Sequence, residues 1–224
     1  MKKVFKNRDK TLRKIKVNHP KQQSFNEKLK TLDSSSNIFE FVKLPPGEDT
    51  NEWIALNTFD FFGNIQSFYE MMFEICTTKS CPTMCIGDSE CRWKNKDKSL
   101  SSLPAIEYID NCLNYCQEQL DNPKIFPCEI GAEFSEKFGK TVDLMFKRMF
   151  RVYGHFYLHH FDEMKRLDVE KHFNSSFKRF ICFSAEFDLL KVKDVEIMQD
   201  VLDNIMPDLM ETFKTNEKKK KGKK

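Results

Sequence analysis

Residues 141–164 constrain the fold of this chain more than any other stretch. Their apolar side chains recur at alternating spacings of three and four residues, at Val142, Met145, Met149, Val152 and Phe156. This period is typical of a long helix that buries one face. The same stretch carries three clustered cations and three histidines, which a buried stripe does not explain, so each cluster indicates a binding partner.

Composition favours a helical fold for the rest of the chain. Among 224 residues there are 22 Phe but only 7 Gly and 8 Pro, which suits long helices joined by few tight turns. Asp49 followed by Glu52 resembles a capping box for one further helix. Helix starts are predicted near Thr50, near Pro104, and at a cap formed by Asn174 or Ser175. We therefore predict an all-α fold, for which a helical bundle is the natural packing.

Four other segments give weaker local signals. Residues 24–32 are predicted to form a short helix, and residues 38–44 alternate in polarity and are predicted to be extended. Residues 76–102 have no helical period, so we predict an irregular loop with room for a small hairpin. The last helical region, residues 194–213, contains Pro207, which should interrupt it.

Charge divides the chain into three parts. Residues 1–22 hold nine Lys or Arg and one Asp, and residues 217–224 hold six Lys and one Glu, so both ends are predicted to be disordered. Residues 23–216 carry 22 basic and 32 acidic residues, and they are predicted to form a single helical domain. An acidic body attracts cationic partners and argues against a nucleic-acid-binding core.

Hydropathy and cysteine content predict the compartment. No stretch approaches the ~20 continuous apolar residues of a membrane span, and no apolar leader lies at the N-terminus. We therefore expect a cytoplasmic protein, with the nucleus as a second compartment. The eight cysteines should then be thiols, and spaced thiols in a reducing compartment indicate metal binding before disulfides.

Two pairs of residues with equal internal spacing indicate a metal site. Cys76 and Cys81 form a C-x4-C pair in the predicted loop, and His155 and His160 form an H-x4-H pair in the predicted helix. Two thiolates and two imidazoles are a typical closed tetrahedral zinc set. On an unbroken helix, however, residues four apart share a face whereas residues five apart differ by roughly 140°. Spacing alone therefore favours His159 over His160 as the partner of His155.

The spacing leaves an alternative open, in which the cysteines are ordinary buried thiols and the histidines are core or surface residues. A catalytic zinc would need an open coordination position, yet four protein ligands leave none, and the chain contains no HExxH motif. We therefore interpret the predicted site as structural. A metal there would fasten the loop of residues 76–102 to the central helix, and its binding energy would contribute to folding.

The cations Lys147, Arg148 and Arg151 lie at positions i, i+1 and i+4, within one wide arc of the predicted helix. Such charges most often form a solvated face. Here only Asp143 is an acidic neighbour, so the three cations repel one another unless an anion offsets them. Arg favours bidentate phosphate contacts, and hydrogen bonds to charged groups contribute roughly 1.5–3 kcal/mol each. The pattern therefore indicates a phosphate-binding face.

Four ordered motifs resemble a known family. They are LPPGEDTNEWIALNTFDFF (44–62), ICTTKSCPTM (75–84), KRMFRVYGHFYLHHFD (147–162) and HFNSSFKRFICFSAEFDLL (172–190). Together they are similar to the Mob family of kinase activators (Mob/phocein), most of all to the branch that activates NDR/LATS-type kinases. The resemblance extends from about residue 25 to residue 206.

The resemblance implies a zinc-clipped helical bundle with a four-helix core and no enzymatic activity. It implies a co-activator in Hippo-like signalling, which binds the basic N-terminal region of an NDR/LATS-type Ser/Thr kinase and docks phosphothreonine peptides of an upstream kinase. Two alternatives stay open: a zinc-dependent hydrolase, and a scaffold in a phosphatase–kinase complex like that of the phocein branch.

The resemblance also implies roles for individual positions. The family's zinc ligands fall on Cys76, Cys81, His155 and His160, which selects His160 over His159. Its phosphopeptide pocket falls on Lys147, Arg148 and Arg151. Its kinase-binding surface falls on Glu48, Glu52, Trp53 and Asp60.

Three positions need separate comment. Trp53 is also compatible with a core position. Thr11 and Thr31 lie roughly where relatives are phosphorylated by upstream kinases, although an insertion at residues 33–36 weakens the match of Thr31. One departure stands in the predicted loop, where Arg92-Trp93 replaces the His-Trp pair that relatives tend to have.

Overall fold

The computed structural model describes residues 38–95, 97–129, 131–207 and 209–221. The described residues form one compact unit. Several expectations fall on residues 1–37 and so lie outside the described residues: the basic arm, the short helix at 24–32, and the candidate phosphorylation sites Thr11 and Thr31.

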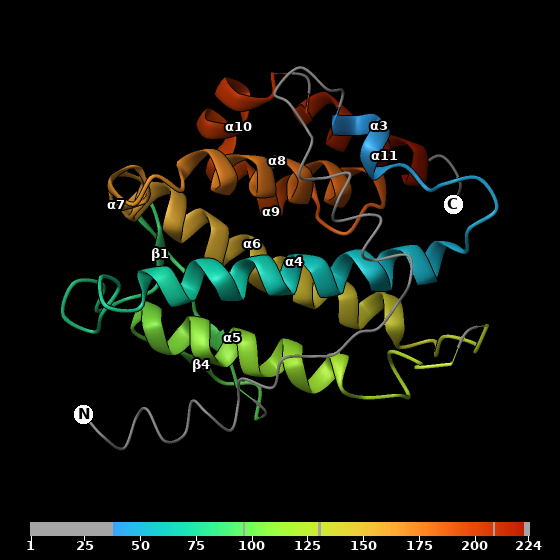
Figure 1. Ribbon diagram of the computed structural model, residues 1–224, viewed down its shortest axis with the longest axis horizontal. Helices are drawn as coiled ribbons and strands as arrows, with labels where there is room; N and C mark the ends of the chain where they lie inside the picture. Colours follow the sequence, from blue (N-terminus) through green and yellow to red (C-terminus); the bar gives the residue numbers. More distant parts are fainter. Residues whose placement is uncertain (1–37, 96, 130, 208, 222–224) are drawn as a thin grey trace. The chain divides into compact units, whose positions relative to one another are not determined.

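The described residues are mostly helical, which confirms the predicted all-α class (Figure 1). The helices are α3 Ile38–Val42, α4 Thr50–Met72, α5 Ala105–Leu120, α6 Phe138–His159, α7 Phe161–Arg166, α8 Glu170–Glu186, α9 Val192–Val195, the 3-10 turn η1 Glu196–Met198, α10 Gln199–Ile205 and α11 Leu209–Lys221. No helix in this part of the chain is both long and apolar enough to cross a membrane.

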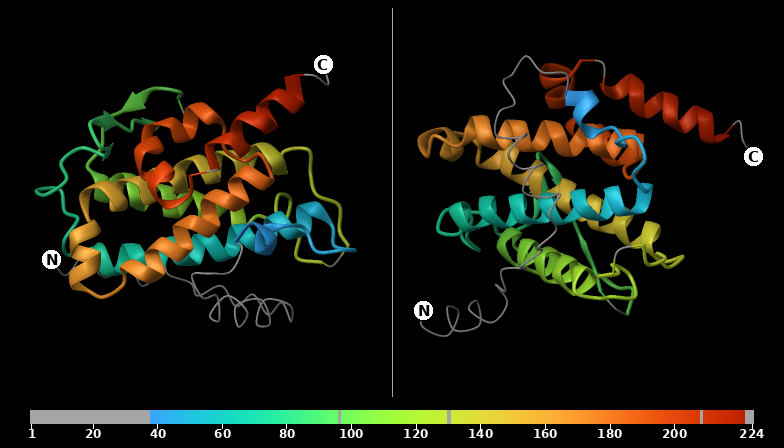
Figure 2. Two further views of the ribbon diagram at one scale, coloured as in Figure 1. Left: turned by 90° about the horizontal axis from the view of Figure 1, so that it is seen from above. Right: turned by 45° about the vertical axis from the view of Figure 1, so that its right-hand side comes forward.

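Four helices form the predicted core. α4 contacts α5, α6 and α8, and α5 also contacts α6, as the two views of Figure 2 show. Aromatic rings fill the centre: Phe61 of α4 lies edge-on to Phe146 of α6, 5.8 Å between ring centroids, and to Phe180 of α8, at 5.2 Å. All three rings are completely buried. Edge-to-face ring pairs stabilise a core by more than the burial of their apolar area alone would. The packing of this core therefore explains why the chain is rich in phenylalanine.

Two predicted helix boundaries are confirmed. The Asp49 carboxylate accepts hydrogen bonds from the backbone N–H groups of Asn51 (2.8 Å) and Glu52 (3.0 Å), which caps α4 as predicted. The Glu52 carboxylate, the second member of the predicted capping box, accepts a hydrogen bond from the Gly131 N–H at 3.4 Å instead. Near Pro207, α10 ends at Ile205 and α11 begins at Leu209.

The prediction of extended structure over residues 38–44 is wrong. Residues 38–42 form the helix α3, which packs on α8. The apolar side chain of Val42 is buried, and its carbonyl accepts a hydrogen bond from the indole nitrogen of Trp53 at 3.2 Å. These contacts are tertiary, so alternation of polarity over a few residues could not reveal them.

The predicted start of α8 at Asn174 or Ser175 is also wrong, because the helix already begins at Glu170. The Ser175 hydroxyl donates back to the carbonyl of Lys171 at 2.9 Å, a bond that serine makes inside a helix rather than at its start. At the other end of the chain, α11 continues to Lys221, so the boundary predicted after residue 216 lies within a helix.

The segment between α4 and α5 contains two small hairpins, where the sequence left room for one. β1 (Cys85–Ile86) pairs with β2 (Ser89–Glu90), and β3 (Trp93–Lys94) pairs with β4 (Leu100–Ser101), both antiparallel. β1 packs on α6 at Gly154, where an added Cβ would lie 3.1 Å from Ile86 and 2.9 Å from the Met198 sulfur. The glycine therefore allows both the first hairpin and η1 to approach α6 closely.

Candidate metal centre and adjoining cationic pocket

Two cysteines and two histidines converge in the fold. One donor atom from each of Cys76, Cys81, His155 and His160 lies within 4.8 Å of all the others. Cys76 Sγ is 3.5 Å from His155 Nε2, and Cys81 Sγ is 3.3 Å from His160 Nε2. In a tetrahedral zinc site with the usual bond lengths, sulfur and nitrogen ligands are about 3.5 Å apart. The donor set and its spacing therefore fit a tetrahedral metal ion.

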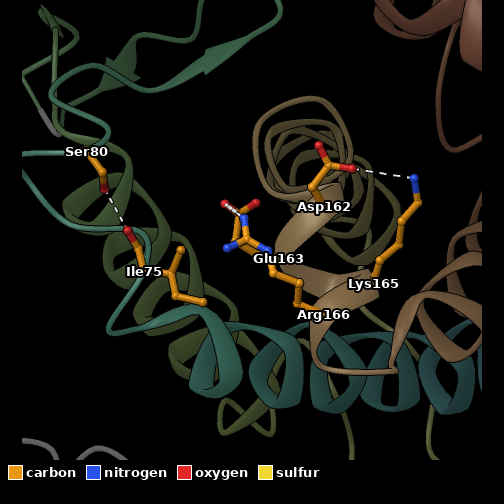
Figure 3. A network of polar contacts seen from close by, with 6 residues as sticks. All are labelled: Ile75, Ser80, Asp162, Glu163, Lys165 and Arg166. Atoms are coloured by element: carbon orange, nitrogen blue, oxygen red, sulfur yellow. Dashed lines mark hydrogen bonds and ion pairs between the residues drawn. The ribbon is translucent and has the colours of Figure 1, made fainter.

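The two cysteines are positioned by the chain that follows α4. The Cys76 N–H donates to the carbonyl of Met72 at 2.7 Å, which continues the last turn of that helix. The Ser80 hydroxyl donates to the Ile75 carbonyl at 2.7 Å (Figure 3) and accepts from the Thr77 N–H at 2.8 Å. This small turn returns the chain, so that Cys81 lies opposite Cys76.

The two histidines are positioned by the end of α6. The sequence predicts one helix through Met164, but α6 ends at His159, and His160 has the non-helical dihedral angles φ −133° and ψ 14°. His160 therefore turns inward and is buried, whereas His159 is exposed. The spacing argument for His159 fails because it assumed an unbroken helix.

The chain resumes directly as α7, which carries its own stabilising pairs. Asp162 and Lys165 lie 3.5 Å apart, and Glu163 and Arg166 lie 3.1 Å apart, each at spacing i, i+3 (Figure 3). Their acids lie in the first turn and their bases in the last, as the helix dipole favours. The break at His160 thus separates two helices instead of fraying one.

Hydrogen bonding and burial set the protonation of the donors. His155 donates from Nδ1 to the carbonyl of Cys85 at 2.8 Å, which leaves the Nε2 lone pair facing Cys76. Burial lowers the pKa of His155 to about 4 and also lowers the pKa of His160, so both imidazoles are neutral, as metal ligands must be. Burial, and then the neighbouring Cys81, raise the pKa of Cys76. Its thiolate therefore needs a cation beside it.

A pocket of about 190 Å³ lies beside α6 and the first hairpin. Four of its lining side chains are cationic: Arg92, Lys147, Arg151 and Lys193. Two are carboxylates, Glu90 and Asp194, and the remainder are Ile86, Cys91, Phe150 and Ile197. We call this the cationic pocket. Its charged and apolar lining residues suit an anionic group attached to an apolar chain.

The three predicted phosphate-binding cations have different positions. Lys147 and Arg151 line the cationic pocket, and Arg151 donates to the Tyr108 hydroxyl at 2.9 Å. Arg148 does not line it: its side chain is 8% exposed, and its guanidinium lies between the rings of Trp93 (3.9 Å) and Tyr115 (4.0 Å). Its Nη1 has no hydrogen-bond partner among the described residues. The cation–π contacts with the two rings therefore offset the cost of burying its charge.

The four residues predicted for a kinase-binding surface also differ in exposure. Trp53 is 8% exposed and packs into the core. Asp60 forms an ion pair with the buried Arg179, which also donates to Asn57 at 2.8 Å. Glu48 and Glu52 are partly exposed near the start of α4. A binding surface at this place therefore depends on the two glutamates.

Sequence reasoning missed part of the cationic pocket. Arg92, Glu90, Lys193 and Asp194 come from a hairpin segment and a short helix that are far from residue 147 in the sequence. Among these four residues, only Arg92 stood out in the sequence, because it departs from the His-Trp pair expected from the family resemblance. The other three line the pocket because of tertiary contacts, which no local sequence pattern encodes.

Fold and site together define a helical bundle in which a Cys2His2 cluster joins the start of a hairpin segment to the end of a core helix. The Mob1/phocein family model matches residues 29–198, and the chain belongs to this family.

Individual relatives agree with this assignment. The chain is 44% identical over 180 residues to the "Maintenance of ploidy protein mob1" of Schizosaccharomyces pombe, covering 79% of this chain and 85% of the relative. It is 40% identical over 175 residues to "MOB kinase activator-like 1A" of Arabidopsis thaliana (77% and 81% covered). It is also 40% identical over 175 residues to "MOB kinase activator-like 1 homolog A" of Dictyostelium discoideum (77% and 82%).

The geometry predicts which histidine supports metal binding. In His160→Asn, affinity for Co²⁺ should fall by more than the roughly 10–100-fold that loss of a mere hydrogen-bond partner around a ligand causes, because a donor is lost. His159→Asn is the matched control and should bind like the wild type. The visible absorption of the bound Co²⁺ and competition with a chelator measure both. Equal losses in the two variants would contradict the assignment of His160.

Proposed function

We propose that this protein is a non-catalytic activator of a protein kinase. The observation that carries the proposal is membership of the Mob1/phocein family, with 40% identity to relatives whose names call them kinase activator-like. The Cys2His2 cluster is consistent with it, because four protein donors complete a tetrahedral set and suit a structural ion. We assign zinc to this cluster: Cys76, Cys81, His155 and His160 would hold it, and the ion would fasten the hairpin segment to α6.

The cationic pocket is proposed to dock phosphothreonine peptides of an upstream, Hippo-type kinase. Lys147 and Arg151 are the two cations of the predicted set that line it. Phosphate oxygens would accept charge-assisted hydrogen bonds from both side chains. The apolar residues Ile86, Phe150 and Ile197 would contact the threonine methyl group and neighbouring peptide side chains.

A binding experiment tests the docking proposal. A fluorescent phosphothreonine peptide should bind the wild type at least tenfold more tightly than its unphosphorylated form, since each charge-assisted bond contributes roughly 1.5–3 kcal/mol. Lys147→Ala and Arg151→Ala should each remove most of that difference. Fluorescence anisotropy at fixed ionic strength measures the affinities.

Lys140→Ala provides the matched control, because Lys140 is an exposed cation on the same helix, α6, and does not line the pocket. Its affinity for the phosphorylated peptide should equal that of the wild type. If the wild type bound both peptides equally, the docking proposal would be wrong.

The second proposed surface binds the basic N-terminal region of an NDR/LATS-type kinase. Residues 23–216 carry a net charge of −10, and Glu48 and Glu52 are partly exposed acids near the start of α4. Such a surface steers a cationic segment toward it and raises the rate of association. Trp53 and Asp60 would act indirectly, by holding α3 and α8 against α4.

Charge reversal tests the kinase surface. Glu48→Lys with Glu52→Lys should weaken binding of a basic kinase peptide by at least tenfold at low salt, because two attractive charges become repulsive. Glu70→Lys makes the same kind of change at an exposed position near the far end of α4 and should have little effect. Isothermal titration calorimetry measures both. Equal weakening in the two variants would show only a general charge effect and would reject this surface.

A further inference from the structure

One carboxylate of the cationic pocket lies against the lysine proposed to bind phosphate. Asp194 Oδ2 is 3.5 Å from Lys147 Nζ, and the two side chains are 20% and 34% exposed. Both side chains line the pocket. The ion pair thus occupies the place at which a phosphate oxygen would meet Lys147.

The same carboxylate acts on the second cation. Burial by itself would lower the pKa of Arg151, but the neighbouring Tyr108, Cys91 and Asp194 side chains together raise it. Asp194 is therefore electrostatically coupled to both Lys147 and Arg151. An anion that contacts Lys147 and Arg151 would therefore also be repelled by the Asp194 carboxylate.

Asp194 is not free to turn away from an incoming anion. Its Oδ2 accepts the backbone N–H of Lys191 at 3.0 Å, a bond that closes the first turn of α9. Swinging the carboxylate into solvent would break this bond as well as the ion pair. Its negative charge therefore stays in the pocket whether or not an anion is bound.

We propose that Asp194 is a built-in counter-ion that limits the affinity of the cationic pocket for phosphate. The inference rests on the proposed phosphopeptide function. Asp194 would hold Lys147 in place while no ligand is bound and would oppose a phosphate group once it enters. Phosphopeptide binding would then be weaker, and more readily reversed, than in a pocket with the same four cations and no Asp194 carboxylate.

The variant Asp194→Asn tests this proposal, because it removes the charge but keeps an oxygen that can accept from the Lys191 N–H. It should bind the phosphothreonine peptide roughly fivefold more tightly than the wild type. A peptide with Glu in place of the phosphothreonine carries one negative charge instead of about two, so its affinity should rise less. Asp194→Ser also keeps an acceptor and should behave like Asp194→Asn, which guards against misfolding of either variant.

Asp200→Asn is the control, because it removes the same charge from an exposed position on α10, outside the pocket. It should leave both affinities unchanged. The inference is overturned if Asp194→Asn binds the phosphorylated peptide no more tightly than the wild type while the wild type still prefers that peptide. A wild type that bound phosphorylated and unphosphorylated peptides equally would instead reject the docking function itself.

Discussion

The convergence of Cys76, Cys81, His155 and His160 is the constraint on which the rest of the functional surface depends. The described residues between α4 and α5 form two hairpins of two-residue strands, and hairpins of that size are barely stable alone in water. Ordering such a segment costs backbone entropy at every residue. An ion shared by the start of this segment and the end of α6 would offset that cost and fix where the hairpins lie.

The position of the hairpins in turn determines the charges around α6. The second hairpin brings the Trp93 ring to within 3.9 Å of the Arg148 guanidinium, which lies buried between two rings. The segment between the hairpins supplies Arg92 to the cationic pocket, and Arg92 pairs with Glu90 at 3.0 Å. In the same pocket, Asp194 pairs with Lys147. The Asp194 carboxylate thereby reduces the repulsion between neighbouring cations on α6.

Elements governed by local physical chemistry could be predicted from the sequence. The Asp49 cap, the interruption near Pro207 and the apolar stripe of α6 each follow from a short pattern and agree with the structure. The break at His160 could not be read from spacing, because the sequence around it is helical in pattern and the contact of His160 with Cys81 is a tertiary one.

Features that depend on contacts between distant segments escaped sequence reasoning. The helix α3 depends on its packing against α8 and on the hydrogen bond from Trp53 to Val42. Lys193 and Asp194 reach the pocket because α9 lies beside α6, and no periodicity of either helix encodes that neighbourhood. Family resemblance implied His160 as a ligand, but it implied no role for Asp194.

Amide hydrogen exchange of the metal-loaded and metal-stripped protein tests most directly whether the Cys2His2 cluster holds the hairpin segment in place. Exchange reports local opening separately for each part of the chain. Removal of the metal should speed exchange at residues 85–101 by at least roughly tenfold while the amides of α4 and α8 stay protected, and added Zn²⁺ should restore the slow rates. Equal protection of residues 85–101 with and without metal would contradict the account.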